Sequence, residues 1–490
     1  METRIRNTAL RSLVMEAGEA ASLVTFGMTV AVGGYTSCGY PKTVIRALAD
    51  RKTAGEDLWL NIISGANNGF VDTILAEQEI IRYRAPMIES KVLASQVNKG
   101  QVRYCEQQMN KMPRLLKTEA FGHIDVAIVE ALAVYEDGSL VPTNAVGMMP
   151  NLIAMADRVI VEINTAMPLE MEGMHDIFLP EGGPVPLTSC DERIGQKTVP
   201  CPVEKIAAIV ASDILDEVAE LAPVKPAQKA VSDNLLNFLE LEMKKQGKTT
   251  LPPIQTGFGN LAAEIVTGLG ESSFRDLEFF GGVAQEANIR LVKDGKARAI
   301  TCGSVKCSEP VLQWLWEEEK VREKVIFRNG EVTNSSEVIA RLGPVTLTSG
   351  IEMDIYGNVN SSHISGSRVV NGLGGGANFA QNGSLSVMMI VSENKGGAIS
   401  TIVPMVSHQD ISEHDIDVVV TEHGVADLRG LSDVDRANAI IENCSGLYKE
   451  QLKDYLKRAV ETTGGHHPVL LDEAFSWHRA LKEQGTMLKT

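Results

Sequence analysis

The sequence predicts an α/β protein with mostly parallel sheets. Short runs of Val, Ile and Ala recur along the chain, stretches of helical character separate them, and two of the runs are similar to each other. Runs that are apolar on both faces and alternate with helices are typical of a parallel sheet that helices cover on both sides. At 490 residues the chain is longer than a single core usually supports, so we expect two domains.

The expected strands follow one another in a regular order. In the first half they are residues 28–34, 123–131, 157–164 and 205–212, and in the second half 343–350, 384–392 and 415–424. Pro41 is expected to open a helix after the first strand, with Val44, Ile45 and Leu48 on its buried face. The C-terminal segment 454–485 has helical pieces on either side of a Gly-Gly break, which we interpret as helices packed on the second domain.

Two strands look like copies of one another. IDVAIVEA at 124–131 and IDVVVTEH at 416–423 share Ile, Asp, Val and Glu in register. Between the two halves, residues 220–234 contain two prolines among polar residues, which is typical of a linker. We therefore predict an N-terminal domain over residues 1–222 and a C-terminal domain over 223–490.

Composition excludes several classes of protein. Hydrophobic residues make up 44% and charged residues 22%, which is typical of a globular chain. The formal net charge is −17 and there is no sustained basic run, so we expect no nucleic-acid partner. No segment approaches a membrane span and no targeting segment is evident, so the sequence predicts a soluble cytoplasmic protein with no membrane partner.

The cysteines favour a reduced compartment and no metal site. The chain has seven, an odd number, scattered along its length. Cys302 and Cys307 are separated by four residues, which is too loose for a zinc knuckle, and no second pair answers them. We predict no metal and no permanently bound cofactor.

Three glycine-rich loops follow apolar strands, at 32–50, 253–269 and 369–383. In the second loop, Gly257 and Gly259 flank Phe258 and a helix is expected from about Asn260, so its amides could face an anion or a carbonyl oxygen. The third loop lacks the last glycine of a dinucleotide-binding fingerprint, and we expect no helix directly after it. A Rossmann dehydrogenase is therefore disfavoured, whereas flexible loops at sheet ends remain an alternative reading.

Longer motifs carry a family resemblance. QTGFGN, GIEMDIYGNVNSSHISG, NGLGGGANF, the segment 400–432 and GMHDI together resemble the acetyl-CoA hydrolase and acyl-CoA:carboxylate CoA-transferase family, which includes succinyl-CoA:acetate, propionyl-CoA:succinate and 4-hydroxybutyrate CoA-transferases. The resemblance runs nearly end to end. It implies two similar open α/β domains, usually in a homodimer, with acyl-CoA and a small carboxylic acid as substrates.

The resemblance also implies roles for particular residues. In such enzymes a glutamate attacks the acyl-CoA thioester and later carries CoA as a glutamyl thioester. Amides of Phe258 and Gly375 are expected to bind the oxyanion of each tetrahedral intermediate. The residues expected to bind CoA are Gly257, Phe258, Gly259, Asn260, Leu261, Asn371, Gly374, Gly375 and Lys395.

The glutamate itself is missing from this chain. The family places it 24 residues after Phe258, where this sequence has Gly282 within EFFGGVAQE. Glu286 is expected in the next helix and Glu278 at the start of the strand, about 13 Å away along an extended chain, so solvated or capping roles suit both better than substitution as nucleophile. Asn360 is expected to orient pocket groups. His423 could contact an acceptor carboxylate or simply be held by hydrogen bonds.

The Gly-Gly stretch resembles the citrate lyase α subunit, which has no glutamate at this place. There the acceptor carboxylate attacks the donor thioester directly, and the thiolate then attacks the mixed anhydride. Bare glycines would leave room for that second carboxylate. We therefore expect a CoA-transferase that moves CoA between an acyl-CoA and a small carboxylic acid by this direct route. An acyl-CoA hydrolase and a non-catalytic CoA-binding or partner subunit are the alternatives, and acyl-carrier protein could replace CoA as the thiol carrier.

Overall fold

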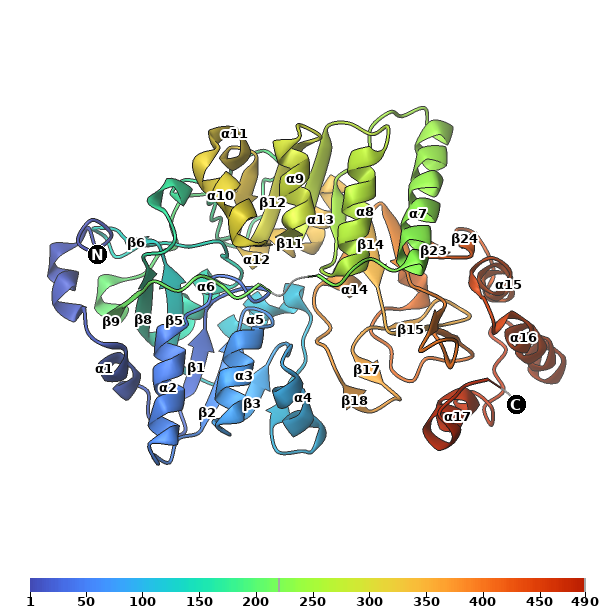
Figure 1. Ribbon diagram of the computed structural model, residues 1–490, viewed down its shortest axis with the longest axis horizontal. Coiled ribbons are helices and arrows are strands. Elements are labelled where there is room, and N and C mark those ends of the chain that lie inside the picture. Colours follow the sequence, from blue (N-terminus) through green and yellow to red (C-terminus); the bar gives the residue numbers. More distant parts are fainter. Residues whose placement is uncertain (219–220, 489–490) are drawn as a thin grey trace. The chain divides into compact units, whose positions relative to one another are not determined.

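The computed structural model describes residues 1–218 and 221–488, and the chain divides into two compact units (Figure 1). The first unit comprises Met1–Glu220 and Glu278–Leu342, and the second comprises Leu221–Leu277 and Gly343–Thr490. The units are thus not continuous along the chain, because residues 278–342 group with the N-terminal part, unlike in the expected division after residue 222. Glu220, the first residue of the expected linker, lies outside the described residues.

The first unit is built on a parallel sheet of strand order β4-β3-β2-β1-β5-β8-β9. Its strands are β1 (Thr29–Val32), β2 (Leu60–Ser64), β3 (Ile81–Ala85), β4 (Arg103–Tyr104), β5 (Ile124–Ala131), β8 (Ala156–Asn164) and β9 (Ile206–Ser212). Its helices are α1 (Ala17–Ser22), α2 (Thr43–Thr53), α3 (Gly69–Glu77), α4 (Lys91–Asn98), α5 (Met112–Lys117) and α6 (Met149–Met155). All four strands expected in this half are confirmed, and α2 buries Val44, Ile45 and Leu48 as predicted.

Residues 278–342 add further strands and helices to the first unit. Strands β13, β12 and β11 lie side by side in that order. The segment contains β11 (Leu277–Gln285), α9 (Glu286–Lys293), β12 (Ala297–Lys306), α10 (Glu309–Glu317), α11 (Glu319–Arg322), β13 (Val325–Phe327), α12 (Gly330–Thr333) and α13 (Ser336–Leu342). Its contacts with the N-terminal part include the buried ion pair of Arg328 with Asp176 and bridges of Ala145 with Ser304 and Gly147 with Asn329.

The second unit has its own run of strands, in the order β10-β14-β19-β23-β24. The first four are parallel, and β24 closes the edge as an antiparallel hairpin. The main elements are α7 (Pro226–Lys245), β10 (Ile254–Thr256), α8 (Asn260–Glu271), β14 (Val345–Ser349), α14 (Gly376–Asn382), β19 (Leu385–Met389), β23 (Val418–Thr421) and β24 (Gly424–Asp427). The strands expected at 343–350 and 384–392 are confirmed, and that at 415–424 is shorter because residues 413–415 form a 3-10 turn.

Short strands and three C-terminal helices complete the second unit. The strands are β15 (Glu352–Asp354), β16 (Val359–Asn360), β17 (His363–Ile364), β18 (Arg368–Val369), β20 (Glu393–Asn394), β21 (Ile399–Ser400) and β22 (Ile402–Val403). The helices are α15 (Asp433–Cys444), α16 (Lys449–Thr463) and α17 (Ser476–Gln484), of which α16 and α17 confirm the helical pieces expected within 454–485. Their apolar faces join one core cluster with β19 and β23, which includes Met388, Val419, Ile440, Leu452 and Trp477.

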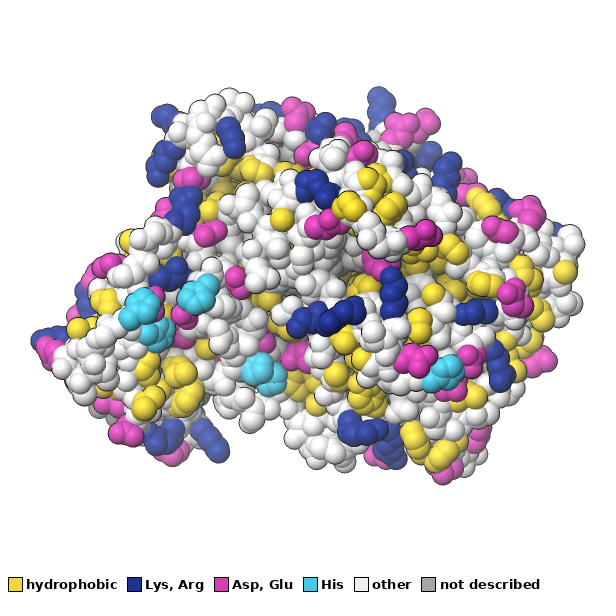
Figure 2. Space-filling view, turned by 180° about the vertical axis from the view of Figure 1, so that it is seen from behind, with side chains coloured by type: hydrophobic (Ala, Val, Ile, Leu, Met, Phe, Trp, Pro, Cys, Tyr) yellow, Lys and Arg dark blue, Asp and Glu magenta, His cyan; other side chains and the backbone are white. Residues whose placement is uncertain are grey.

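Two expectations about local structure are wrong. The linker expected at 220–234 is largely helical, because α7 begins at Pro226. Proline is favoured in the first turn of a helix. The segment 369–383 is not a loop throughout, because α14 (Gly376–Asn382) forms its second half. Among the described residues no helix is both long and apolar enough to cross a membrane. Lys, Arg, Asp and Glu side chains are interspersed on the face shown in Figure 2.

Candidate functional site

Several of the predicted binding residues lie at one edge of the sheet in the second unit. Because β10, β14, β19 and β23 are parallel, their carboxyl ends share an edge, which is where open α/β sheets bind ligands. The loop of Gly257, Phe258 and Gly259 follows β10 there, and α8 begins directly after it with Asn260 and Leu261. Phe258 has an exposed fraction of 43%, and Gly259 has φ +120°, a conformation that favours glycine.

The start of α8 is fixed by a side chain. Asn260 Nδ2 donates to the carbonyl oxygen of Ala222 at 2.6 Å, which ties the beginning of the helix to the segment before α7. A helix start presents amide groups that have no partner within the helix, and the helix dipole adds a partial positive charge. The edge therefore suits an anionic or carbonyl ligand at this point.

The second predicted loop lies beside the same sheet. Gly375 is the residue that precedes α14, and Gly374 has φ +67°. Asn371 N donates to Ser362 O at 3.3 Å. The helix α14 packs on β14 and β19, since its Ala377, Phe379 and Ala380 are buried, so it holds Gly375 in a fixed place. The structure thus brings both predicted oxyanion loops, at Phe258 and Gly375, next to strands of one sheet.

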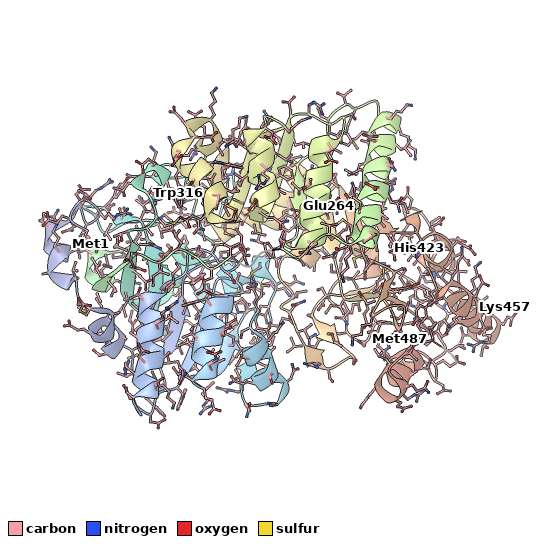
Figure 3. The ribbon with its side chains drawn as sticks, viewed as in Figure 1. Met1, Glu264, Trp316, His423, Lys457 and Met487 are labelled. Atoms are coloured by element: carbon pink, nitrogen blue, oxygen red, sulfur yellow. The ribbon has the colours of Figure 1, made fainter. Side chains whose placement is uncertain are left out.

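His423, labelled in Figure 3, comes shortly after β23. Its ring lies in a cluster of polar groups. Its Nε2 is 3.1 Å from Ser392 Oγ, and Ser392 Oγ donates to Glu422 Oε1 at 2.8 Å. A Cβ on Gly446 would come within 2.3 Å of His423 Nε2, so glycine is needed there for the ring to fit. The imidazole is therefore held by hydrogen bonds and packing, while its side chain keeps 44% exposure at this edge.

Lys395 lies in the turn between β20 and β21. It is exposed and has φ +50°, which is a left-handed conformation for a residue that is not glycine. The hairpin of β20 and β21 follows β19 in the chain, so Lys395 comes after the carboxyl end of that strand.

Asn360 is a buried organiser of the loop that follows β16. Its Nδ2 donates to Glu352 Oε1 at 3.0 Å and to His363 O at 2.8 Å, and its Oδ1 accepts from His363 N at 2.9 Å. Glu352 also accepts from His478 Nε2 at 2.8 Å, and although burial alone would raise its pKa, the hydrogen bond and charge of His478 bring that pKa to about 2. Asn360 therefore orients a loop through an ionised carboxylate.

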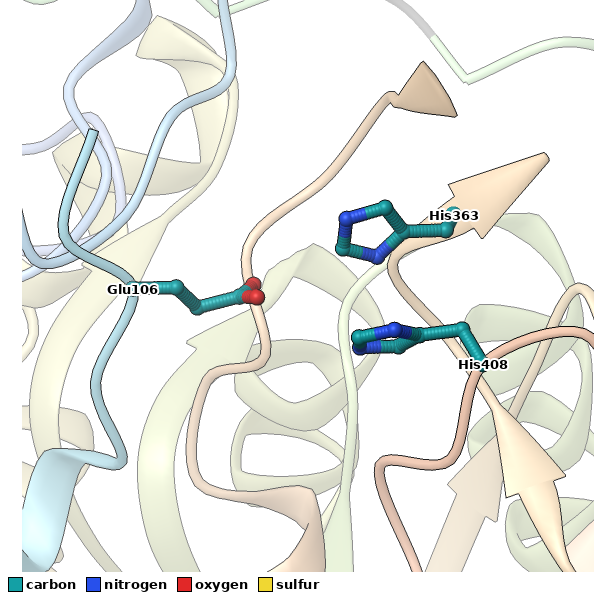
Figure 4. A group of neighbouring side chains, drawn as sticks. All are labelled: Glu106, His363 and His408. Carbon is teal, nitrogen blue, oxygen red and sulfur yellow. The ribbon is translucent and has the colours of Figure 1, made fainter. Parts of the chain in front are cut away.

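Two histidines lie together beside that loop (Figure 4). The rings of His363 and His408 have centroids 3.9 Å apart and are tilted by 34°. His408 Nε2 lies 3.1 Å from Asp410 Oδ1, and Ser362 Oγ donates to Asp410 Oδ2 at 2.7 Å. Burial, and then the neighbouring His408, lower the pKa of His363 below its ordinary value. These contacts tie the loops of His363 and His408 together.

One group in the second unit could hold a metal ion. Glu413, Asp433 and His467 each offer a ligand atom, and these atoms lie within 4.8 Å of one another. His467 Nδ1 is 2.7 Å from Asp433 Oδ2, so a carboxylate–imidazole hydrogen bond already explains their proximity.

Gly282 belongs to the first unit, in the middle of β11 and half-buried. Its φ is outside the left-handed region, so the backbone conformation does not require glycine. A Cβ at this position would lie 3.3 Å from Tyr35 Oη and 3.4 Å from Tyr35 Cε1. A side chain at Gly282 would therefore begin in close contact with the phenol of Tyr35.

Each of the two neighbouring glutamates has a partner of its own. Glu278 pairs with Arg298. Glu286 is the first residue of α9, where its Oε2 accepts from Ser308 Oγ at 2.7 Å and its Oε1 pairs with Arg290. Burial alone would raise the pKa of Glu286, but the hydrogen bond from Ser308 and the pair with Arg290 hold it below its ordinary value. The positions of both carboxylates are thus accounted for by these partners.

Sequence reasoning missed the surroundings of Gly282. Tyr35, Asn334 and Gly303 come from three separate segments, and Asn334 Nδ2 donates to Tyr35 Oη at 2.9 Å. No pattern in one sequence connects Gly282 to Tyr35, because the glycines that pack against this ring, Gly147, Gly282 and Gly303, are far from it along the chain.

The family follows from comparison with known proteins. The model of the acetyl-CoA hydrolase/transferase N-terminal domain matches residues 2–210, and that of the acetyl-CoA hydrolase/transferase C-terminal domain matches residues 311–456. The chain therefore belongs to the acetyl-CoA hydrolase/transferase family and is an enzyme of that family by descent.

Three curated relatives cover almost the whole chain. It is 39% identical over 496 residues to succinyl-CoA:acetate CoA-transferase of Clostridium kluyveri, with 99% of this chain and 92% of that protein covered. It is 36% identical to an acetyl-CoA hydrolase of Candida glabrata, covering 99% and 97%. It is 33% identical to propanoyl-CoA:succinate CoA transferase of Escherichia coli, covering 97% and 98%.

Solved structures confirm the fold class. RipA from Yersinia pestis is 19% identical, with a TM-score of 0.73 over 94% of this chain and 99% of that one. The 4-hydroxybutyrate CoA-transferase from Porphyromonas gingivalis is 18% identical, with a TM-score of 0.64 over 92% and 98%. The predicted α/β class with mostly parallel sheets is thus confirmed.

Proposed function

We propose that this protein is a CoA-transferase that moves CoA between an acyl-CoA and a small carboxylic acid without a glutamyl-CoA intermediate. The observation that carries the proposal is the glycine at position 282 in a chain that is 39% identical to succinyl-CoA:acetate CoA-transferase. The engagement of Glu278 with Arg298 and of Glu286 with Ser308 and Arg290 supports it, because neither carboxylate is left over for nucleophilic attack.

The proposed chemistry uses the acceptor acid as the nucleophile. A carboxylate oxygen of the acceptor attacks the thioester carbon, the carbon–sulfur bond breaks, and CoA leaves as a thiolate. The thiolate then attacks the acceptor carbonyl of the mixed anhydride, and the donor acid leaves as a carboxylate. Each addition puts negative charge on an oxygen, which amides of Phe258 and Gly375 would stabilise. Gly257, Asn260, Leu261, Asn371, Gly374 and Lys395 would hold CoA beside them.

A second candidate function is hydrolysis of acyl-CoA, which the 36% identity to an acetyl-CoA hydrolase favours. A non-catalytic CoA-binding subunit is the third.

The deciding experiment incubates the enzyme with acetyl-, propionyl- or succinyl-CoA and a panel of acids, and follows both new acyl-CoA and free thiol. Transfer gives a new acyl-CoA with little thiol, hydrolysis gives thiol at a rate that added acid does not change, and binding without either product indicates the third. A homodimer is part of the proposal and is tested by sedimentation of the same sample.

The route is tested by initial rates and by variants. Double-reciprocal plots at several acceptor concentrations should intersect, as a ternary complex requires, and borohydride should trap no adduct. The variants Glu278→Gln and Glu286→Gln should each retain transfer within about tenfold, since neither carboxylate reacts. Parallel plots, a trapped glutamyl adduct, or a loss of more than about a thousandfold in either variant would overturn the direct route.

A further inference from the structure

Three glycines from separate segments surround the ring of Tyr35. A Cβ on Gly147 would lie 2.4 Å from Tyr35 Cδ2, one on Gly303 would lie 3.1 Å from Cε1, and one on Gly282 would lie 3.3 Å from Oη. Contacts this short leave no room for a side chain at Gly147 and little at the other two. The ring is therefore seated in a slot made by bare backbone, with its hydroxyl against Gly282.

The hydroxyl of Tyr35 accepts a hydrogen bond within the protein but donates none among the described residues. Tyr35 has 2% exposure, and its Oη accepts a hydrogen bond from Asn334 Nδ2 at 2.9 Å. Among the described residues no acceptor receives the hydrogen of this O–H group. Burying a donor without an acceptor costs about 1–3 kcal/mol, so such a group normally meets a ligand or a water molecule.

The hydroxyl also keeps its proton under ordinary conditions. Burial raises the pKa of Tyr35 to about 12, against the opposing effect of the hydrogen bond from Asn334. The group is thus a neutral donor at neutral pH and not a phenolate nucleophile. Hydrogen bonds from a hydroxyl to a carboxylate are roughly twice as strong as those between neutral groups.

The loop that carries Tyr35 is strained in the way that functional loops often are. Thr36 has φ +52° and Ser37 has φ +58°, although neither is glycine, and for a β-branched residue such as Thr36 this conformation is an outlier. The strain is held by a hydrogen bond between Thr36 Oγ1 and Ser304 Oγ, one residue beyond Gly303 on β12. Backbone strain of this kind persists where the surrounding structure over-determines it, and it clusters at binding and active sites.

We propose that the phenol of Tyr35 donates a hydrogen bond to the carboxylate of the acceptor acid beside Gly282, and that Asn334 orients it. This inference rests on the proposed function. At the position where the family carries a glutamate, the chain then presents a neutral donor that binds a carboxylate and does not attack a thioester. The residue that sets the affinity for the acceptor acid is Tyr35, and Asn334 is a positioning residue.

The test is Tyr35→Phe, which keeps the ring in the slot and removes only the hydroxyl. We expect the KM for the acceptor acid to rise about tenfold to a hundredfold, as for loss of a charge-assisted hydrogen bond, with the KM for acyl-CoA unchanged. The matched control is Tyr104→Phe, which removes a hydroxyl that donates to Pro86 O in the same unit. Asn334→Ala should raise the same KM by less, because the phenol remains.

A direct binding measurement separates this inference from the proposed function. Calorimetry with acetate and succinate, in the presence of free CoA, should show weaker binding to Tyr35→Phe than to the wild type and to Tyr104→Phe. If the wild type transfers CoA but Tyr35→Phe keeps its affinity and KM for the acids, the inference is wrong and the function stands. If the wild type transfers nothing but Tyr35→Phe loses carboxylate affinity, the function is wrong and the inference stands. An equal rise in the KM for the acceptor acid and the KM for acyl-CoA would also overturn the inference, since it would indicate a general structural effect.

Discussion

At the scale of single residues, Gly282 owes its identity to a neighbour and not to its own backbone conformation. Its φ is one that any residue adopts, and the short approach of Tyr35 is what a side chain would disturb. The sequence indicated that bare backbone was needed in EFFGGVAQE, but it did not indicate for what. The partner, Tyr35, is separated from it by more than two hundred residues, and such a contact leaves no periodic signal in one sequence.

The first prediction concerns Gly282→Ala. Because the new methyl group would lie 3.3–3.4 Å from Tyr35, the ring or the strand must shift, and we expect destabilisation of about 1–3 kcal/mol. Urea unfolding of the wild type, of Gly282→Ala and of the control Gly183→Ala measures the loss of stability. Gly183 is a suitable control because nothing lies within 4 Å of a Cβ there. The double variant Tyr35→Leu with Gly282→Ala should lose less than the sum of the single changes. Strict additivity would contradict the packing argument.

At the scale of elements, the seven apolar runs singled out in the sequence form strands, whereas strands β2, β3 and β12 and the irregular helix α14 were not anticipated. Buried apolar runs such as Ile124–Ala131 identify themselves by composition. Helix α14, with the sequence GANFAQN, has poor intrinsic propensity, and it forms because Phe379 and Ala380 pack against β14 and β19. The candidate site follows the same division, since its glycine loops are visible in the sequence whereas the tyrosine slot depends on tertiary contacts.

A buried charge cluster joins three elements of the first unit. Lys42, at the start of α2, lies 2.5 Å from Glu130 of β5 and 2.8 Å from Asp216. Glu162 of β8 accepts from the amides of Lys42 and Val44 at 2.8 and 3.1 Å, so it caps the helix. The cluster holds more carboxylates than cations. Burial, opposed by Lys42 and aided by Asp216, therefore raises the pKa of Glu130 to about 7.

The second prediction is a pH dependence of stability. A carboxyl whose pKa is higher in the folded state binds its proton more tightly there, so its contribution is full below the ordinary value of 4.5 and is lost as pH rises through about 7. We expect stability of the first unit to fall on the order of 1–3 kcal/mol over this window. Glu130→Gln, which stays neutral, should flatten that fall in urea titrations at pH 5, 6, 7 and 8. The exposed control Glu204→Gln should keep it, and an unchanged slope in Glu130→Gln would refute the assignment.

At the scale of the whole molecule, the first compact unit is assembled from two separate pieces of chain. Residues 278–342 supply Gly282 and Gly303 to the Tyr35 slot and Arg328 to Asp176. The expected boundary after residue 222 took the chain as two consecutive halves, which is the simplest reading of a repeated strand motif. Sequence does not reveal that a later segment returns to an earlier unit, because the contacts that bind it are long-range.

The last prediction follows from that assembly. A protein of residues 1–222 alone would leave Asp176 buried without Arg328, at a cost of about 3–5 kcal/mol, and would expose the surface that β11 to β13 cover. Residues 1–220 joined by a flexible Gly-Ser linker to 278–342 would retain both. We expect the joined protein to unfold cooperatively on heating, and the 1–222 fragment to bind ANS and melt broadly. A joined protein with a scrambled 278–342 sequence is the control. Cooperative unfolding of the 1–222 fragment at the same temperature would show that the later segment is not part of its core.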